Sequence, residues 1–323
     1  MKRKIRFMFP LLLLSLPLTG CDFITIKDKE DDTVNVNKYY EGLDLEDSGG
    51  PLALALQEFM FEKHTKWITY GQVDSYYSKT TNRNSVEAIA DGSNKNQFFY
   101  TGKEASGKGT REHVWPCVSS GGLWTHDKPS SGFSQYYVDN SSYIGGGSDL
   151  FHIRTCTSSI NTARGSASFV DFDDPEFEGI KGDVVSYGEN NGKWDIKIYG
   201  ASQTSTGGYT YANLIEPDDN MKGDIARIVT YVWVHYHNRG FYPTGSQVSG
   251  GNKFEFKNFI GNIPLTQVMG YADYDRAKET LMEWNKLDPV SEVEKLRNNT
   301  VQKIQGNRNP FVDYPNLIDQ LFE

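Results

Sequence analysis

The feature that most constrains the fold is an apolar helical pattern over residues 224–237. Large apolar side chains recur there at i, i+3, i+4, i+7, i+8 and i+11, and they are Ile225, Ile228, Val229, Val232, Trp233 and Tyr236. This spacing places them along one side of a helix, which must pack that side against other elements. The sequence therefore predicts a well-packed helix from Asp224 to His237.

Both helical and strand-like patterns occur elsewhere in the chain. Apolar side chains near helical spacing begin after Pro51 and recur over residues 274–284 and 291–304, whereas strand-like runs lie at 184–187 and 194–199. A long Gly/Ser-rich segment covers residues 119–148, and loops of that length are usually functional or mobile. Without an internal repeat or a clear internal boundary, these patterns predict one loop-rich α+β domain over residues 51–323.

The first twenty residues have the layout of an export signal. A basic start precedes an apolar run from Phe7 to Leu18, which is too short to span a bilayer comfortably and ends at Leu-Thr-Gly-Cys21. This ending resembles the bacterial lipobox, whose cysteine becomes the lipidated N-terminus; an ordinary secretory signal with an incidental cysteine is the alternative. We predict a lipoprotein signal peptide over 1–20, lipid attachment at Cys21 and an acidic, flexible tether over 21–50.

Charge and cysteine content narrow the function classes. The formal net charge is −9, and removal of the signal peptide takes away four further positive charges. Attraction to a polyanion must then come from a local basic face or a bound cation. The three cysteines are too few for a disulfide-dense scaffold or a Cys-rich zinc module.

Four of the six histidines give little sign of chemistry. His64 lies at a Lys-rich helix end and is expected to be solvated, and His126 is expected to be exposed in the Gly/Ser loop. His235 and His237 lie two residues apart on the predicted helix, which separates them by about 200° around the axis. We therefore do not expect them to share a metal ion.

The other two histidines stand in a more informative order of elements. His113 follows Glu112 on one strand-like stretch, and His152 lies on a second such stretch after the Gly/Ser loop. Residues 158–165 then predict a short helix, capped by Thr157 or Ser158, that carries Asn161 and Arg164 on one face. Glutamate and asparagine oxygens favour Mg²⁺ or Ca²⁺ over zinc, although a Glu-His pair by itself is usually structural.

These segments resemble the bacterial endonuclease I family of the His-Me finger (ββα-metal) superfamily. The resemblance rests on three motifs in the family order, which are Arg111–Pro116, Asp149–Arg154 and Ser158–Arg164. Later segments at 222–227, 284–290 and 305–313 resemble the family as well, so the resemblance covers roughly residues 50–315. It implies an α+β domain built around a ββα-metal motif.

The resemblance also implies roles for the matching residues. His113 matches the general base, and Glu112 and Asn161 match the two protein ligands of a single Mg²⁺, for which Ca²⁺ or Mn²⁺ can substitute. Some relatives carry a phosphate-binding arginine in the loop after the histidine, but residues 117–148 contain none. Either Lys128, Arg154, Arg164 or Arg227 then contacts the phosphate, or the transition state is supported less strongly here; we predict Arg154 and Arg164 for this task. Phe151 occupies a position that is often histidine in the family.

Two cysteines also replace more usual polar residues of the family. Export places Cys117 and Cys156 in an oxidising compartment, and lipidation of Cys21 leaves only these two to pair. We predict a disulfide that braces the site, and two buried free thiols are the alternative.

The predicted function is that of an exported, surface-anchored or released, Mg²⁺-dependent endonuclease. We expect it to act as a monomer on DNA, and on RNA as well, with little sequence preference because it reads the phosphate backbone, and to leave 5′-phosphate ends as the family does. A catalytically silent, nucleic-acid-binding lipoprotein of the same fold is one alternative, against which the intact Glu112-His113-Asn161 set argues. A hydrolase acting on a lipid head group is another, for which the Gly/Ser loop offers no apolar groove.

Overall fold

The computed structural model describes residues 34–77, 97–104, 109–116, 145–205, 207–236 and 265–323. The helices are α1 (Val36–Tyr39), α2 (Gly49–Lys63), α3 (Tyr70–Tyr77), α6 (Ser158–Arg164), α7 (Asp219–Tyr236), α8 (Leu265–Val268), α9 (Tyr274–Leu287), α10 (Glu292–Gln305), α11 (Pro310–Asp313) and α12 (Leu317–Phe322), with 3-10 helices at Gly146–Ser148 and Pro175–Asp183. The strands are β1 (Thr110–His113), β2 (Ile153–Cys156), β3 (Ser168–Phe169), β4 (Val185–Tyr187), β5 (Ile196–Tyr199) and β6 (Leu214–Glu216). Mixed helices and small sheets confirm the α+β class.

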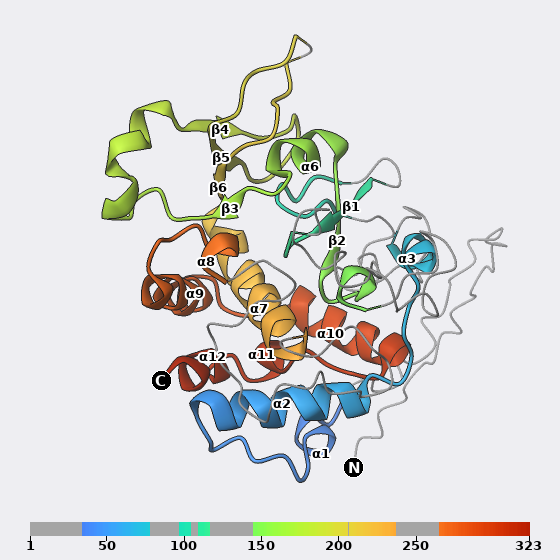
Figure 1. Cartoon of the computed structure of the whole chain (residues 1–323). Coiled ribbons are helices and arrows are strands. Elements are labelled where there is room, and N and C mark those ends of the chain that lie inside the picture. Colours follow the sequence, from blue (N-terminus) through green and yellow to red (C-terminus); the bar gives the residue numbers. More distant parts are fainter. Residues whose placement is uncertain (1–33, 78–96, 105–108, 117–144, 206, 237–264) are drawn as a thin grey trace, which may run out of the picture. The chain divides into compact units, whose positions relative to one another are not determined.

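Helix α7 forms the centre of the helical layer, where it packs against α2, α9 and α11 (Figure 1). Nearly every residue from Met221 onward is buried. The helix begins five residues earlier than the apolar spacing predicts, because Asp218 accepts a hydrogen bond from the Asn220 N–H at its first turn. The predicted last residue, His237, lies outside the described residues.

Capping explains where α9 and α10 begin. The Asp273 carboxylate accepts hydrogen bonds from the first turn of α9, and Ser291 and Glu294 form a reciprocal capping box on α10. Both helices confirm the spacing over 274–284 and 291–304. From the middle of α7, Arg227 donates two hydrogen bonds to Glu294, of 2.7 and 2.8 Å, which ties α7 to α10.

The strands form two separate sheets. One has four strands in the order β3-β6-β5-β4, with β3 and β6 parallel and the other pairs antiparallel. The predicted runs at 184–187 and 194–199 appear in it as β4 and β5. The other sheet is the antiparallel pair β1 and β2, and α6 follows β2 directly. This strand-strand-helix order is the arrangement expected from the sequence.

Ordered structure begins before the predicted domain start at residue 51. Helix α1 and the first turn of α2 lie inside the interval predicted as a tether. Tyr40 is buried, and its hydroxyl donates a 2.8 Å hydrogen bond to Asp313. Residues 36–50 are therefore part of the domain, because Tyr40 contributes apolar surface that the polar composition of this interval concealed. Within the described ranges, none of the helices is both long and apolar enough to cross a membrane.

Candidate active site

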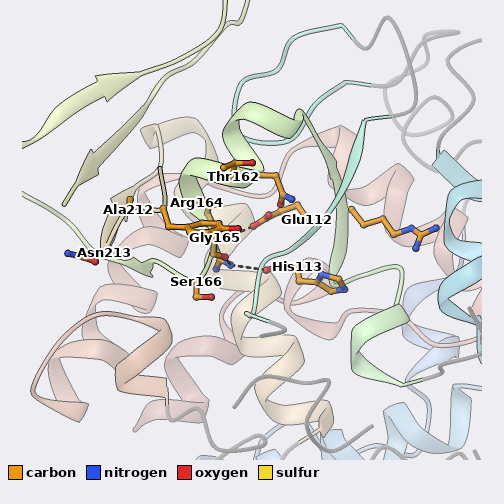
Figure 2. Close-up of a pocket in the computed structure, with 11 residues that line it drawn as sticks. Glu112, His113, Thr162, Arg164, Gly165, Ser166, Ala212 and Asn213 are labelled. Atoms are coloured by element: carbon orange, nitrogen blue, oxygen red, sulfur yellow. Dashed lines mark hydrogen bonds and ion pairs between the residues drawn. The ribbon is translucent and has the colours of Figure 1, made fainter. Parts of the chain in front are cut away.

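The ββα unit brings the three predicted functional residues to one cavity. Glu112 and His113 are the last two residues of β1, and Asn161 lies in the middle of α6. All three line a cavity of about 670 Å³, together with the turn that follows α6 and the segment 211–213. Figure 2 shows these elements around the cavity.

Local chemistry sets the positions of the strands and the helix. In the pairing of β1 with β2, Glu112 lies opposite Arg154 and His113 lies opposite Ile153. Thr157 then caps α6 by accepting a hydrogen bond from the Ile160 N–H, as one of the two predicted caps. The helix ends at Arg164 and is followed by Gly165, whose φ of +51° favours glycine.

Glu112 is held as a buried carboxylate beside a positive charge. The Tyr100 hydroxyl donates a 2.8 Å hydrogen bond to Oε1, and Arg164 Nε lies 3.4 Å from the same oxygen. Burial raises the pKa of Glu112, and the positive charge of Arg164 and the hydrogen bond from Tyr100 oppose that rise. These two neighbours compensate part of the cost of keeping a charged carboxylate away from water.

The remaining donor atoms at the cavity fit a hard divalent cation. Among the described residues, none forms a hydrogen bond or ion pair with Glu112 Oε2, and the same holds for the side-chain amide of Asn161. A carboxylate oxygen and an amide oxygen are the ligands that Mg²⁺ accepts, and two protein ligands leave positions for water and phosphate oxygens. Glu112 and Asn161 could therefore hold one such ion.

His113 presents a neutral imidazole at the edge of this cavity. Its Nε2 lies 2.9 Å from the carbonyl oxygen of Gly147. Because a carbonyl only accepts, the neutral ring carries its proton on Nε2 and its lone pair on Nδ1. Loss of solvent lowers the pKa of His113 to about 4, the hydrogen bond to Gly147 opposes that change, and the charges of Arg164 and Arg111 add to it. The ring is therefore in its base form at neutral pH.

A second histidine holds the backbone that orients His113. His152 is buried, with its ring centroid 5.4 Å from that of His113. Its Nδ1 donates to Gly146 O at 2.7 Å, and its Nε2 accepts from the Trp115 N–H at 2.9 Å. Burial lowers the pKa of His152 to about 3, so the ring remains neutral. His152 thus connects Gly146, the neighbour of Gly147, to Trp115 in the turn that follows β1.

The two arginines predicted to contact phosphate lie in different environments. Arg164 lines the cavity but is buried. It donates hydrogen bonds to the backbone oxygens of His113 (3.1 Å, Figure 2) and Val114 (2.5 Å). Arg154 does not line the cavity as the described residues define it; it packs over the Phe99 ring at 4.4 Å. The structure therefore brings Arg164, and not Arg154, to the site.

Other cations considered from the sequence are distributed differently. Arg227 is buried in the helical layer and paired with Glu294, and Lys128 lies outside the described residues. Arg111 was not predicted to act, although it lines the cavity. Its Nε lies 2.6 Å from Asp74, and its guanidinium lies 4.0 Å from the ring centre of Tyr70. The pKa of Arg111 is raised, since hydrogen bonds to Asp74 and Tyr70 outweigh desolvation, and the residue stays charged.

The expectation that His64 is solvated is wrong. The side chain is 4% exposed and stacks on Trp67 with ring centroids 3.7 Å apart, because the helix end that carries it turns toward α7. His64 Nδ1 lies 3.3 Å from Nε2 of His235, and both rings lie near Asp149. Burial lowers the pKa of His64 to about 4, although the charge of Asp149 opposes the change.

Of the three cysteines, only Cys156 lies among the described residues. Cys156 is buried at the end of β2, and burial raises the pKa of its thiol. Cys117 and Cys21 lie outside the described residues, as does His126. The disulfide between Cys117 and Cys156 and the lipid on Cys21 therefore stay predictions.

Several contributors to the site carried no clear signal in the sequence. Tyr100 reaches Glu112 from a segment that contains no recognisable motif, and Tyr211 enters the cavity from the connection between β5 and β6. His152 stood in a motif, but its position gave no role until the loop carbonyls were placed around it. Tyr100 has an unusual backbone conformation, with a positive φ of 69°, but the sequence does not reveal it.

Comparison with known proteins gives consistent results. The family model for endonuclease I matches residues 55–316. The chain is 28% identical to an extracellular ribonuclease of Bacillus subtilis (strain 168) over 293 residues. The aligned region covers 89% of this chain and 79% of that protein. It is 29% identical to an extracellular ribonuclease of Bacillus amyloliquefaciens over 280 residues. Here the aligned region covers 85% of this chain and 75% of that protein.

Proposed function

This chain belongs to the endonuclease I family and is a nuclease, and from that premise we propose that it hydrolyses RNA and DNA with little sequence preference in a Mg²⁺-dependent reaction. The observation that carries the proposal is the combination of ligand oxygens on Glu112 and Asn161 with a neutral imidazole on His113 at one cavity. The names of the two relatives favour RNA as a substrate, and a site that contacts phosphates accepts either backbone.

Glu112 and Asn161 would hold the metal. When bound, a divalent ion neutralises charge on the scissile phosphate and stabilises the leaving 3′-oxygen. Tyr100 and Arg164 orient the Glu112 carboxylate, because both contact its Oε1 and so leave Oε2 for the metal. Arg164 is also the better placed of the two predicted phosphate contacts, because it lines the cavity.

His113 would take a proton from the attacking water at Nδ1, with its Nε2 proton fixed on the Gly147 carbonyl. Figure 2 shows the Glu112 carboxylate directed toward Arg164 and the His113 imidazole directed away from it. In-line displacement at phosphorus places the attacking and leaving oxygens on opposite sides. Opposite directions for the base and the metal ligand suit that geometry, and the products would carry 5′-phosphate and 3′-hydroxyl ends.

The proposal includes export and attachment to the cell surface through Cys21. The basic start, the apolar run and the Leu-Thr-Gly-Cys21 ending support a lipidated N-terminus, and the two relatives are named extracellular. Two acyl chains suffice for stable anchoring. We expect Cys21→Ser to move the protein from the membrane fraction to the soluble fraction; detergent-phase partitioning that persists would place the anchor elsewhere.

One assay tests the activity. The purified protein is incubated with plasmid DNA and with structured and unstructured RNA, in Mg²⁺ or in EDTA, beside a His113→Ala control. We expect Mg²⁺-dependent cleavage of both polymers by the parent alone, and product ends that a 5′-phosphate-dependent exonuclease accepts. Binding without cleavage by the parent would identify a silent binder, and hydrolysis of a phosphodiester lipid in place of nucleic acid would identify a different hydrolase. Either result would overturn the proposal.

A further inference from the structure

One exposed aromatic side chain differs from the other exposed apolar residues by its place. Tyr211 is 68% exposed, more than any other large apolar side chain in the described part of the chain, of which Leu287 follows at 55%. Single exposed apolar residues are common on protein surfaces and need no explanation by themselves. Tyr211, however, lines the cavity that holds Glu112, His113 and Asn161, and Leu287 does not.

The backbone that carries Tyr211 is hydrogen-bonded to α6, the helix that carries Asn161. The N–H of Ala212 donates a 2.7 Å hydrogen bond to the carbonyl of Ala163 in the last turn of α6, and the N–H of Asn213 bonds to Tyr199 in β5 at 2.8 Å. On the other side, the N–H of Thr210 bonds to Ser202 at 2.8 Å. Figure 2 shows Ala212 beside the end of α6. The side chain at position 211 is therefore held in register with Asn161 and Arg164.

The Tyr211 ring packs against the backbone of Gly165, directly after α6. A Cβ atom at Gly165 would lie 2.3 Å from Cδ1 of Tyr211 and 3.1 Å from Cε1 and from Cγ. A side chain at position 165 would be strained by the positive φ and would also displace the ring that lies on the glycine backbone. One side of the ring packs on the helix terminus, while most of the residue remains open to the cavity and solvent.

We propose that Tyr211 is a stacking platform for an unpaired nucleobase of the strand bound in this cavity. The proposal rests on the proposed nucleic-acid substrate and adds a subsite to it. An aromatic ring fixed on one side and open on the other presents one π-face at a defined height, and every base can stack on such a face whatever its sequence. A chain of net charge −9 gains little long-range attraction to a polyanion, and stacking supplies affinity that does not depend on charge.

The subsite has a consequence for the form of the substrate. Bases in a duplex already stack on their neighbours, so a protein ring reaches them only after they leave the helix. Single strands and loops offer open base faces at no such cost. Tyr211 therefore favours unpaired strands over duplexes, whereas Glu112, His113 and Asn161 contact a backbone that both forms share.

The test measures binding in a His113→Ala background, so that the strand stays intact in Mg²⁺. Variants Tyr211→Ala, Tyr211→Phe and Leu287→Ala are titrated with a single-stranded RNA oligonucleotide carrying 2-aminopurine and with the matching duplex, at several salt concentrations. We expect Tyr211→Ala to weaken single-strand binding about five- to a hundredfold, to abolish the stacking quench of 2-aminopurine, and to change duplex binding less than about twofold. Tyr211→Phe and Leu287→Ala should bind as the parent does.

Because phosphate contacts are untouched, the slope of log Kd against log salt should be equal for Tyr211→Ala and its parent. Equal single-strand affinity of these two proteins would overturn the subsite while leaving the nuclease proposal intact. An equal loss for duplex and single strand, or a loss in Tyr211→Phe as large as in Tyr211→Ala, would also overturn it. A parent that binds no nucleic acid would instead refute the proposed function on which the subsite rests.

Discussion

Two clusters of described residues can offer ligands to a metal, and they differ in how far their oxygens are already occupied. In the helical core, His64, Asp149 and His235 place one ligand atom each within 4.8 Å of one another. At the cavity, Glu112 and Asn161 face a space of about 670 Å³. By proximity alone the core cluster resembles a metal site more closely, because it has three candidate ligands and two imidazoles.

Hydrogen bonding reverses that impression. Both oxygens of Asp149 accept two hydrogen bonds each, at distances from 2.6 to 3.1 Å, and the four donors are the Phe151 N–H, Gln305, Tyr231 and Tyr236. Glu112 receives its contacts on Oε1 alone among the described residues. A cation entering the core would displace hydrogen bonds from a sealed carboxylate, whereas a cation at the cavity would displace none. Saturation, rather than proximity, separates a structural carboxylate from a ligand.

The largest effect expected from this comparison concerns the two histidine positions. His113→Ala should lower turnover by about 10²- to 10⁴-fold, because the attacking water loses its proton acceptor. His64→Gln, which removes a histidine of the core cluster instead, should leave turnover unchanged at a temperature where the variant is folded. Initial rates on fluorescent RNA, with binding measured by anisotropy, check both. More than a tenth of parental activity in His113→Ala would show that the base is a different group.

The two carboxylates should separate in the same way. Glu112→Gln should raise the Mg²⁺ concentration for half-maximal rate by at least about tenfold, because a neutral amide is a weaker ligand than a carboxylate. Asp149→Asn should leave that midpoint unchanged and lower the free energy of unfolding by about 1–3 kcal/mol, because a buried donor is left without its acceptor. Magnesium titrations and urea unfolding of both variants provide the measurements. A midpoint shift in Asp149→Asn would mean that the core cluster communicates with the metal.

His152 tests whether the backbone next to His113 needs its support. His152→Gln removes the link between Gly146 and Trp115, so the Gly147 carbonyl should hold the His113 tautomer less well. We expect kcat to fall about tenfold, with KM and the Mg²⁺ midpoint unchanged, because the base is misplaced and the ligands are not. A rise in KM or in the Mg²⁺ midpoint would indicate a general structural defect instead.

Local patterns predicted those parts of the molecule that depend on local chemistry. The apolar spacing of α7, the cap of α6, and the order β1, β2, α6 are all readable along the chain. Tyr100, Gly147 and Tyr211 were not readable, because each reaches the site by a contact that depends on where a loop returns. His64 was misread for the same reason: its neighbours in sequence are charged, whereas its neighbours in space are Trp67 and His235.

The smallest effect expected is a pH dependence of stability that belongs to the core cluster. Folding lowers the pKa of His64 from 6.5 to about 4, so between these values the unfolded chain binds a proton that the folded chain does not. The contribution to stability is complete above pH 6.5 and is lost as the pH falls toward 4, with a slope of at most about 1.4 kcal/mol per pH unit for one proton. His64→Gln should remove that slope while remaining less stable than the parent at pH 7. Urea unfolding in EDTA at pH 7, 6 and 5 measures the difference between the two proteins, and parallel curves would show that His64 is protonated equally in the folded and unfolded states.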